Sequence, residues 1–148
     1  MTVRVRGNMF KFETLEVWKK SVEFANLMIE IADCIPRNYQ YSFGDQLRRA
    51  GLSVPNCIAE GNGRRSTKES NQLYNVSKGS VYECINIIII LDMRKLIDWS
   101  IFDKRKVYKL AEEIAKMLKV SGVDIARRTV TKYRKNMKIP SSRQRKEF

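Results

Sequence analysis

Apolar residues recur every three or four positions in four separate stretches of this 148-residue chain, and no stretch shows convincing strand alternation. That spacing matches the 3.6-residue turn of an α-helix, because positions three and four apart share one helix face. The stretches begin near Thr14, Ser42, Ser66 and Ser100, and short segments separate them. We therefore predict an all-α fold, an antiparallel up-down four-helix bundle followed by a basic C-terminal extension.

Polar and helix-breaking residues indicate where each helix should begin and end. Thr14 is a candidate N-cap of the first helix. Candidate capping boxes open the other three helices: Ser42 with Asp45, Ser66 with Glu69, and Ser100 with Asp103. Helix-ending residues follow three of the stretches: Pro36 after the first, Gly61 and Gly63 after the second, and Gly122 after the fourth. Pro55 lies inside the second stretch and should kink that helix or break it locally.

Two apolar stripes run along the first predicted helix. The stripe that we assign to the core contains Leu15, Trp18, Val22, Ala25, Ile29 and Ala32. The other stripe lies roughly opposite and contains Val17, Phe24, Leu27, Met28 and Ile31. A surface helix of a monomer carries charges on its outer face, so we expect the second stripe to be an oligomer interface. The alternative is a helix buried on two sides within one chain.

A polar stripe borders the apolar face of the second predicted helix. It contains Gln46, Arg49, Ser53, Cys57 and Glu60. An arginine and a glutamate beside a core must be paired or solvated. We interpret Gln46, Arg49, Ser53 and Glu60 as a structural polar network that fixes the helix register. A functional polar site is the alternative, and an enzyme that uses Arg49 and Glu60 is its extreme form.

The formal net charge is +13, from 29 Lys and Arg residues against 16 Asp and Glu residues. Such a surface attracts nucleic acid or acidic membrane. Residues 123–148 carry nine cations against Asp124 and Glu147, and we interpret them as extended helix followed by disorder. The candidate nucleic-acid-binding residues, including one tyrosine that could stack on a base, are Arg48, Arg64, Arg65, Lys68, Lys104, Arg105, Lys106, Lys109, Arg127, Arg128, Lys132, Tyr133, Arg134, Lys135 and Lys138.

The chain contains no histidine, which removes imidazole-based catalysis and histidine-ligated metals. Cys34, Cys57 and Cys84 lack Cys-x-x-Cys spacing, so we interpret them as buried thiols in a reducing compartment. The longest apolar run, residues 87–91, is far shorter than the ~20 residues of a membrane span. We therefore expect a cytoplasmic protein that is no enzyme, binds no metal or cofactor, and does not contact a membrane.

One stretch of the second helix resembles a known family signature: Gln-Leu-Arg-Arg-Ala-Gly-Leu-Ser-Val-Pro-Asn-Cys-Ile-Ala-Glu-Gly-Asn-Gly-Arg at positions 46–64. It is similar to the "four helix bundle protein" family. That family includes proteins encoded in intervening sequences of bacterial large-subunit rRNA genes and, more distantly, accessory variability determinants of diversity-generating retroelements. Phe12-Glu-Thr-Leu-Glu-Val-Trp18, and Gly79-Ser80 with Glu83, agree with the resemblance. Cys57 stands where the family usually has Asn.

The resemblance covers about residues 12–118 and implies a bundle that assembles into a ring, commonly a pentamer, with basic surfaces. Its retroelement branch implies binding to RNA and to a reverse transcriptase without catalysis. We expect three parts: an N-terminal arm (1–11), the bundle (12–122) and a basic, partly disordered tail (123–148). The predicted function is that of a non-catalytic oligomeric RNA-binding accessory protein, which assists a reverse transcriptase or other ribonucleoprotein. The alternative is a scaffold that docks an acidic protein partner and binds nucleic acid incidentally.

Overall fold

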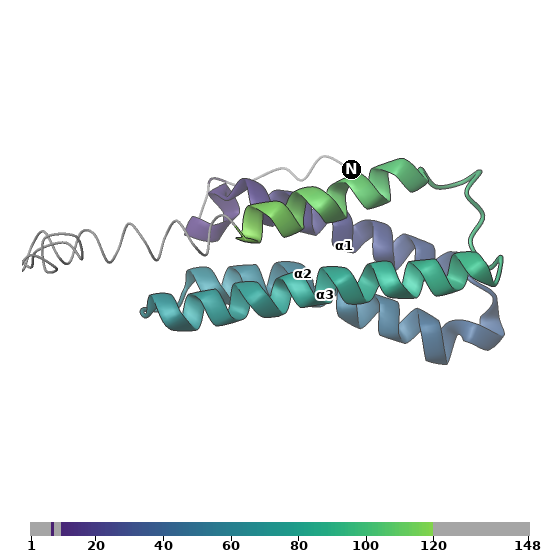
Figure 1. Ribbon diagram of the computed structural model, residues 1–148, viewed down its shortest axis with the longest axis horizontal. Helices are drawn as coiled ribbons and strands as arrows, with labels where there is room; N and C mark the ends of the chain where they lie inside the picture. The colour runs from purple at the N-terminus through teal and green to yellow at the C-terminus, as the bar shows by residue number, and fades with distance from the viewer. Residues whose placement is uncertain (1–6, 8–9, 120–148) are drawn as a thin grey trace, which may run out of the picture.

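Four α-helices run alternately up and down in the computed structural model, which describes residue 7 and residues 10–119 (Figure 1). They are α1 (Glu16–Cys34), α2 (Asp45–Asn62), α3 (Thr67–Met93) and a fourth helix over residues 104–119. Shorter helical turns precede α1 and α2: η1 (Lys11–Thr14), η2 (Arg37–Tyr39) and η3 (Gln40–Gly44). The described part of the chain contains no strand, and the predicted all-α up-down bundle is confirmed.

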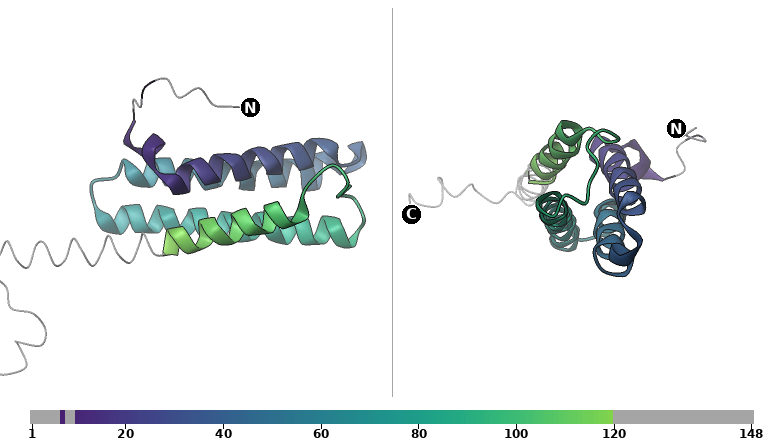
Figure 2. Two further views of the ribbon diagram at one scale, coloured as in Figure 1. Left: turned by 90° about the horizontal axis from the view of Figure 1, so that it is seen from above. Right: turned by 90° about the vertical axis from the view of Figure 1, so that its right-hand side faces the viewer.

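The helices surround one axis in chain order, so the fourth helix lies next to α1 (Figure 2). Two ion pairs join these antiparallel neighbours. Lys20 Nζ lies 2.9 Å from Glu113 Oε2, and Lys106 Nζ lies 2.9 Å from Glu23 Oε1. None of the described helices is long and apolar enough to cross a membrane.

The core is built from large apolar side chains that all four helices direct toward the axis. The fully buried ones are Phe24, Met28 and Ile31 of α1, Leu47, Val54 and Ile58 of α2, Val81, Cys84, Ile88 and Leu91 of α3, and Val107 and Ile114 of the fourth helix. The isoleucine-rich end of α3 is helical, as its period predicts, although β-branched residues favour strands. Removal of this apolar surface from water is the main force that holds the helices together.

The structure corrects the assignment of the two stripes on α1. Phe24 and Met28 are completely buried within the chain, and Val17 and Ile31 are buried as well. Leu27 is partly buried against the same core. The expected oligomer interface on α1 is therefore wrong, because these side chains already contact the other helices of their own bundle. A helix between two neighbours buries a wide arc, which includes Ala25 and Ala32 of the other stripe.

The Ser66 N-cap is confirmed, while three other expected helix starts are wrong. The backbone N–H of Glu69 donates to Ser66 Oγ at 3.1 Å. Thr14 belongs to η1, and its hydroxyl donates to the Lys11 carbonyl at 2.7 Å, so that Leu15 occupies the N-cap position of α1. Neither Ser42 nor Ser100 begins a helix as expected. Ser42 lies inside η3, which runs directly into α2, and Ser100 precedes the fourth helix, which begins at residue 104.

Asp103 takes the capping role that was assigned to Ser100. Its Oδ1 accepts a hydrogen bond from the Lys106 backbone N–H at 3.2 Å, and helix geometry begins at residue 104. The Ser100 hydroxyl instead donates to Asp98 Oδ1 at 2.6 Å within the preceding turn. A local side-chain bond thus competes successfully with the capping bond.

Pro55 is buried inside α2, and the helix continues through it to Asn62 with Gly63 as its C-cap. Of the kink or local break expected at Pro55, the structure rules out the break, and the expected end near Gly63 is correct. Packing of α2 against both α1 and α3 stabilises the helix despite the missing N–H.

Candidate nucleic-acid interface

Among the described residues, the cationic side chains predicted to bind nucleic acid lie toward the two ends of the bundle. Arg64, Arg65 and Lys68 surround the loop between α2 and α3. The cations of residues 104–109 lie at the start of the fourth helix, at the opposite end (Figure 1). The fourth helix alone spans about 24 Å at 1.5 Å per residue, so the two clusters form separate surfaces.

Most cations at the start of the fourth helix are neutralised by acidic neighbours. Lys104 Nζ lies 2.7 Å from Asp92 Oδ2 and 5.5 Å from the centroid of the Trp99 ring. The hydrogen bonds from Lys104 and Trp99 lower the pKa of Asp92 below its ordinary value. Lys106 pairs with Glu23, and Lys109 lies 4.0 Å from Glu113.

These ion pairs explain why cations stand near a helix N-terminus, where the helix dipole disfavours them. Lys104 joins the fourth helix to α3, and Lys106 joins it to α1. Arg105 is the member of this cluster that has no acidic partner within residues 10–119. The cluster therefore links the fourth helix to its two neighbours and offers little free positive charge.

Arg48 is also engaged inside the protein. Its guanidinium donates to Asp33 Oδ1 at 2.7 Å, to Gln40 Oε1 at 2.6 Å and to Asp45 Oδ1 at 3.3 Å. These bonds tie α2 to the end of α1 and to η3. Because four of its five N–H donors are already used, Arg48 has a structural role, which corrects its placement among the phosphate-binding residues.

The α2–α3 loop carries the freer cations. Arg64 pairs with Glu60 one helical turn away. Arg65 and Lys68 are exposed, and no acidic group in the described chain pairs with either. The seven predicted binding residues from Arg127 to Lys138 lie outside the described residues.

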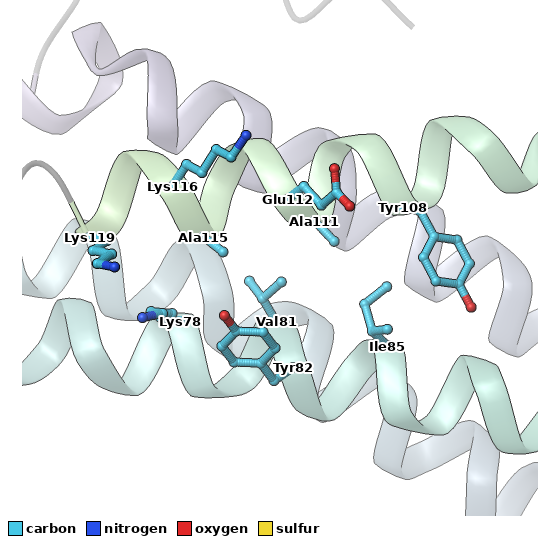
Figure 3. Close-up of a pocket in the computed structure, with 10 residues that line it drawn as sticks. All are labelled: Lys78, Val81, Tyr82, Ile85, Tyr108, Ala111, Glu112, Ala115, Lys116 and Lys119. Carbon is cyan, nitrogen blue, oxygen red and sulfur yellow. The ribbon is translucent and has the colours of Figure 1, made fainter.

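A groove between α3 and the fourth helix contains three lysines that the sequence-based assignment missed (Figure 3). They are Lys78 of α3, and Lys116 and Lys119 of the fourth helix. None has an acidic partner within the described ranges. The last described turn of the fourth helix, to which Lys116 and Lys119 belong, lies at the same end of the bundle as the α2–α3 loop (Figure 1). No sequence signal identified this set, because the residues come from two helices whose relative rotation only the packing fixes.

The structure joins two members of the predicted polar network to α3. Gln46 donates to Glu83 Oε1 at 2.7 Å, and the Ser80 hydroxyl donates to Ser53 Oγ at 2.9 Å. Glu60 instead pairs with Arg64 at the helix end, while Arg49 is exposed. These contacts match a role in helix register better than a catalytic site.

The three cysteines occupy different environments, although all were expected to be buried. Cys84 is buried, which raises the pKa of its thiol to about 12. Cys57 is half-buried, whereas Cys34 is exposed, so the expectation is wrong for Cys34. Between residues 10 and 119, no three His, Cys, Asp or Glu side chains gather as metal ligands would.

Most of the chain matches the model of one known protein family. A model described as 23S rRNA-intervening sequence protein matches residues 13–120. Short stretches also resemble RNA polymerase sigma-54 factors, with 60% identity over 37 residues for the Caulobacter vibrioides protein and 63% over 35 residues for that of Rhizobium meliloti. These stretches cover 25% and 24% of this chain, and the chain spans 7% of each relative.

Proposed function

The chain belongs to the family of 23S rRNA-intervening sequence proteins, and from this premise we propose that it is a non-catalytic, RNA-binding accessory protein. The observation that carries the proposal is the collection of unpaired cations at one end of the bundle. Arg65 and Lys68 lie there, as do the last described residues of the fourth helix, and the basic residues 123–148 follow these in the sequence. Phosphate contacts of this kind neutralise the backbone of RNA and release its counterions.

The proposed binding surface therefore differs from the one that the sequence suggested. It contains the α2–α3 loop with Arg64, Arg65 and Lys68, and the tail residues Arg127, Arg128, Lys132, Tyr133, Arg134, Lys135 and Lys138. The start of the fourth helix contributes less, since three of its four cations are paired. Because phosphates carry no base information, this surface binds with little sequence preference.

We further propose that the protein is a homo-oligomer, and that it assists a reverse transcriptase or another ribonucleoprotein. The resemblance to retroelement accessory proteins supports a ring, with a pentamer as the first candidate. Exposed apolar side chains at the end of the bundle opposite the α2–α3 loop support self-association: Ile89, Ile90, Met93 and Ile101. Clustered exposed apolar residues mark interaction surfaces more often than isolated ones do.

The test is a salt series of RNA affinity with a matched pair of charge variants. We expect Arg65→Gln with Lys68→Gln to weaken binding and to lower the slope of log affinity against log salt by about 1.4, if each contacts one phosphate of a single strand. Arg37→Gln with Lys95→Gln removes the same charge from the opposite end of the bundle and should change the slope less. Both control residues are exposed.

An RNA affinity that does not change with salt would contradict the proposal. Duplex DNA is the second probe, because its phosphates present the same negative charge to these cations. If neither nucleic acid binds, the cations would serve an acidic protein partner, which is the scaffold alternative. Neutralising Arg65 and Lys68 would then weaken binding of that partner.

A further inference from the structure

The groove between α3 and the fourth helix combines an apolar floor with aromatic and charged walls (Figure 3). Its floor contains Val81 and Ile85 of α3, and Ala111 and Ala115 of the fourth helix. Its volume is about 550 Å³, within the range of pockets that hold small ligands. The small alanine side chains keep the fourth helix from filling this space.

Tyr82 presents an aromatic ring at this groove. Its side chain is 59% exposed, although it lies in the middle of a long helix. Lys78 Nζ lies 5.9 Å from the centroid of the Tyr82 ring. Exposed aromatic rings beside cations stack on unpaired bases while the cation contacts the neighbouring phosphate.

Two lysines face each other across one end of the groove. Figure 3 shows Lys78 on α3 and Lys119 on the fourth helix at the same end, on opposite walls. Lys78 lies well inside α3, so no helix terminus accounts for a cation at this position. An anion between the two ammonium groups would relieve their repulsion, so this end suits a phosphate.

Glu112 places a carboxylate in the same groove, between Tyr108 and Lys116 along the fourth helix. No cation within residues 10–119 forms an ion pair with it. A carboxylate repels phosphate but accepts hydrogen bonds from base amino groups, as glutamate does with cytosine N4. Cytosine, adenine and guanine carry such amino groups, whereas uracil presents carbonyl oxygens on both sides of its single N–H.

We propose that this groove binds a nucleotide of single-stranded RNA. The base stacks on Tyr82, the flanking phosphate lies between Lys78 and Lys119, and Glu112 accepts a hydrogen bond from the base amino group. The inference rests on the proposed RNA binding and deepens it, because it adds a base-reading site to a surface that otherwise contacts phosphates. An acidic peptide fits less well, since Glu112 would repel it.

The test compares the affinity of the full-length chain for a short oligocytidylate and an oligouridylate of equal length. We expect Tyr82→Ala to weaken oligocytidylate binding about 5- to 150-fold, the range measured for loss of one stacking partner, and to leave the salt slope unchanged. Tyr82→Phe keeps the ring and should bind like wild type. Tyr41→Ala is the matched control, because Tyr41 is 92% exposed and lies outside the groove.

Two further variants test the contributions of Lys78 and Glu112 separately. Lys78→Gln should lower the salt slope by about 0.7, the value for one phosphate of a single strand. Glu112→Gln should narrow the preference for oligocytidylate over oligouridylate, because the Gln amide can also donate to a uracil carbonyl. Circular dichroism checks that each variant folds, which we expect because Tyr82 and Glu112 are exposed.

The outcomes distinguish this inference from the proposed function. If wild type binds RNA but Tyr82→Ala and Glu112→Gln bind both oligonucleotides as wild type does, the groove is not a base site, and phosphate binding stands. If wild type binds no RNA at low salt, both proposals fall. Loss of affinity in Tyr82→Ala but not in Tyr41→Ala supports the groove.

Discussion

Lys95 adopts a φ of 57°, the left-handed conformation that residues other than glycine rarely take. It follows the last turn of α3 and takes part in a C-capping pattern of backbone hydrogen bonds that ends many helices. The backbone N–H of Lys95 donates to the Asp92 carbonyl, and that of Leu96 donates to the Leu91 carbonyl, both at 2.9 Å. This pattern satisfies the last carbonyls of α3 but places a Cβ where glycine is preferred.

Lys95→Gly should therefore raise the free energy of unfolding by about 1 kcal/mol, because glycine takes the left-handed conformation without a Cβ clash. Urea unfolding monitored by circular dichroism measures the change. Lys95→Ala is the control, since it removes the charge and keeps the Cβ, and it should bring no such gain. Equal stabilisation by both variants would show that charge, not conformation, governs this position.

The thiols should differ in reactivity according to their burial. At pH 8, Cys34 should react quickly with a thiol reagent, whereas Cys84 should react only after the chain unfolds, because burial raises the pKa of its thiol to about 12. Above pH 9 the unfolded chain loses this proton and the folded chain keeps it, so stability should fall as pH rises. Mass spectrometry of labelled peptides, with and without urea, provides the measurement. Rapid native labelling of Cys84 would contradict its burial.

Helix α2 approaches both α1 and α3 closely at positions where a glycine leaves room for the neighbouring side chain. A Cβ on Gly51 of α2 would lie 2.9 Å from Met28 Cβ of α1. A Cβ on Gly61 would lie 2.8 Å from the Tyr74 ring of α3. Gly79 of α3 differs, because no atom beyond its own helix lies within 4 Å of the Cβ position.

Alanine should consequently have opposite effects at two helical glycines. Gly79→Ala should raise the free energy of unfolding by about 1 kcal/mol, the difference in helix propensity. Gly51→Ala should lower it by about 1–3 kcal/mol, since the added methyl group overpacks the α1–α2 contact. Thermal unfolding of the two variants and wild type tests both signs. Stabilisation by Gly51→Ala would mean that α1 and α2 separate more easily than their packing indicates.

At the scale of the whole molecule, four exposed apolar residues lie at the end of the bundle opposite the α2–α3 loop: Ile89, Ile90, Met93 and Ile101. If the apolar end mediates self-association, Met93→Glu with Ile101→Glu should reduce the mass measured by light scattering, because charges would be buried in the contact. Both side chains are exposed in the single chain, so its stability should change little. Phe10→Glu, at another exposed apolar residue, is the control. An unchanged mass would place any interface elsewhere.

The order of residues by itself determined the helices and much of the bundle. Helix periodicity and the cap at Ser66 depend on neighbours a few positions away, and the sequence states these directly. The same local reading failed at Ser42 and Ser100, where neighbouring backbone and side-chain groups offered the hydroxyl another partner. A capping bond and another local hydrogen bond of similar strength compete for each serine hydroxyl, and the sequence alone does not show which bond forms.

Only the tertiary structure decided which apolar stripe of α1 forms the core and which cations remain free. Phe24 and Met28 point inward because the rotation of α1 is set by its packing against the other helices. Arg48 and Lys104 are engaged because Asp33 and Asp92, distant in sequence, lie beside them after folding. The groove of Lys78, Tyr82 and Glu112 likewise exists only once α3 and the fourth helix meet. Contacts between helices depend on rotation and neighbour order, which periodicity along one helix does not specify.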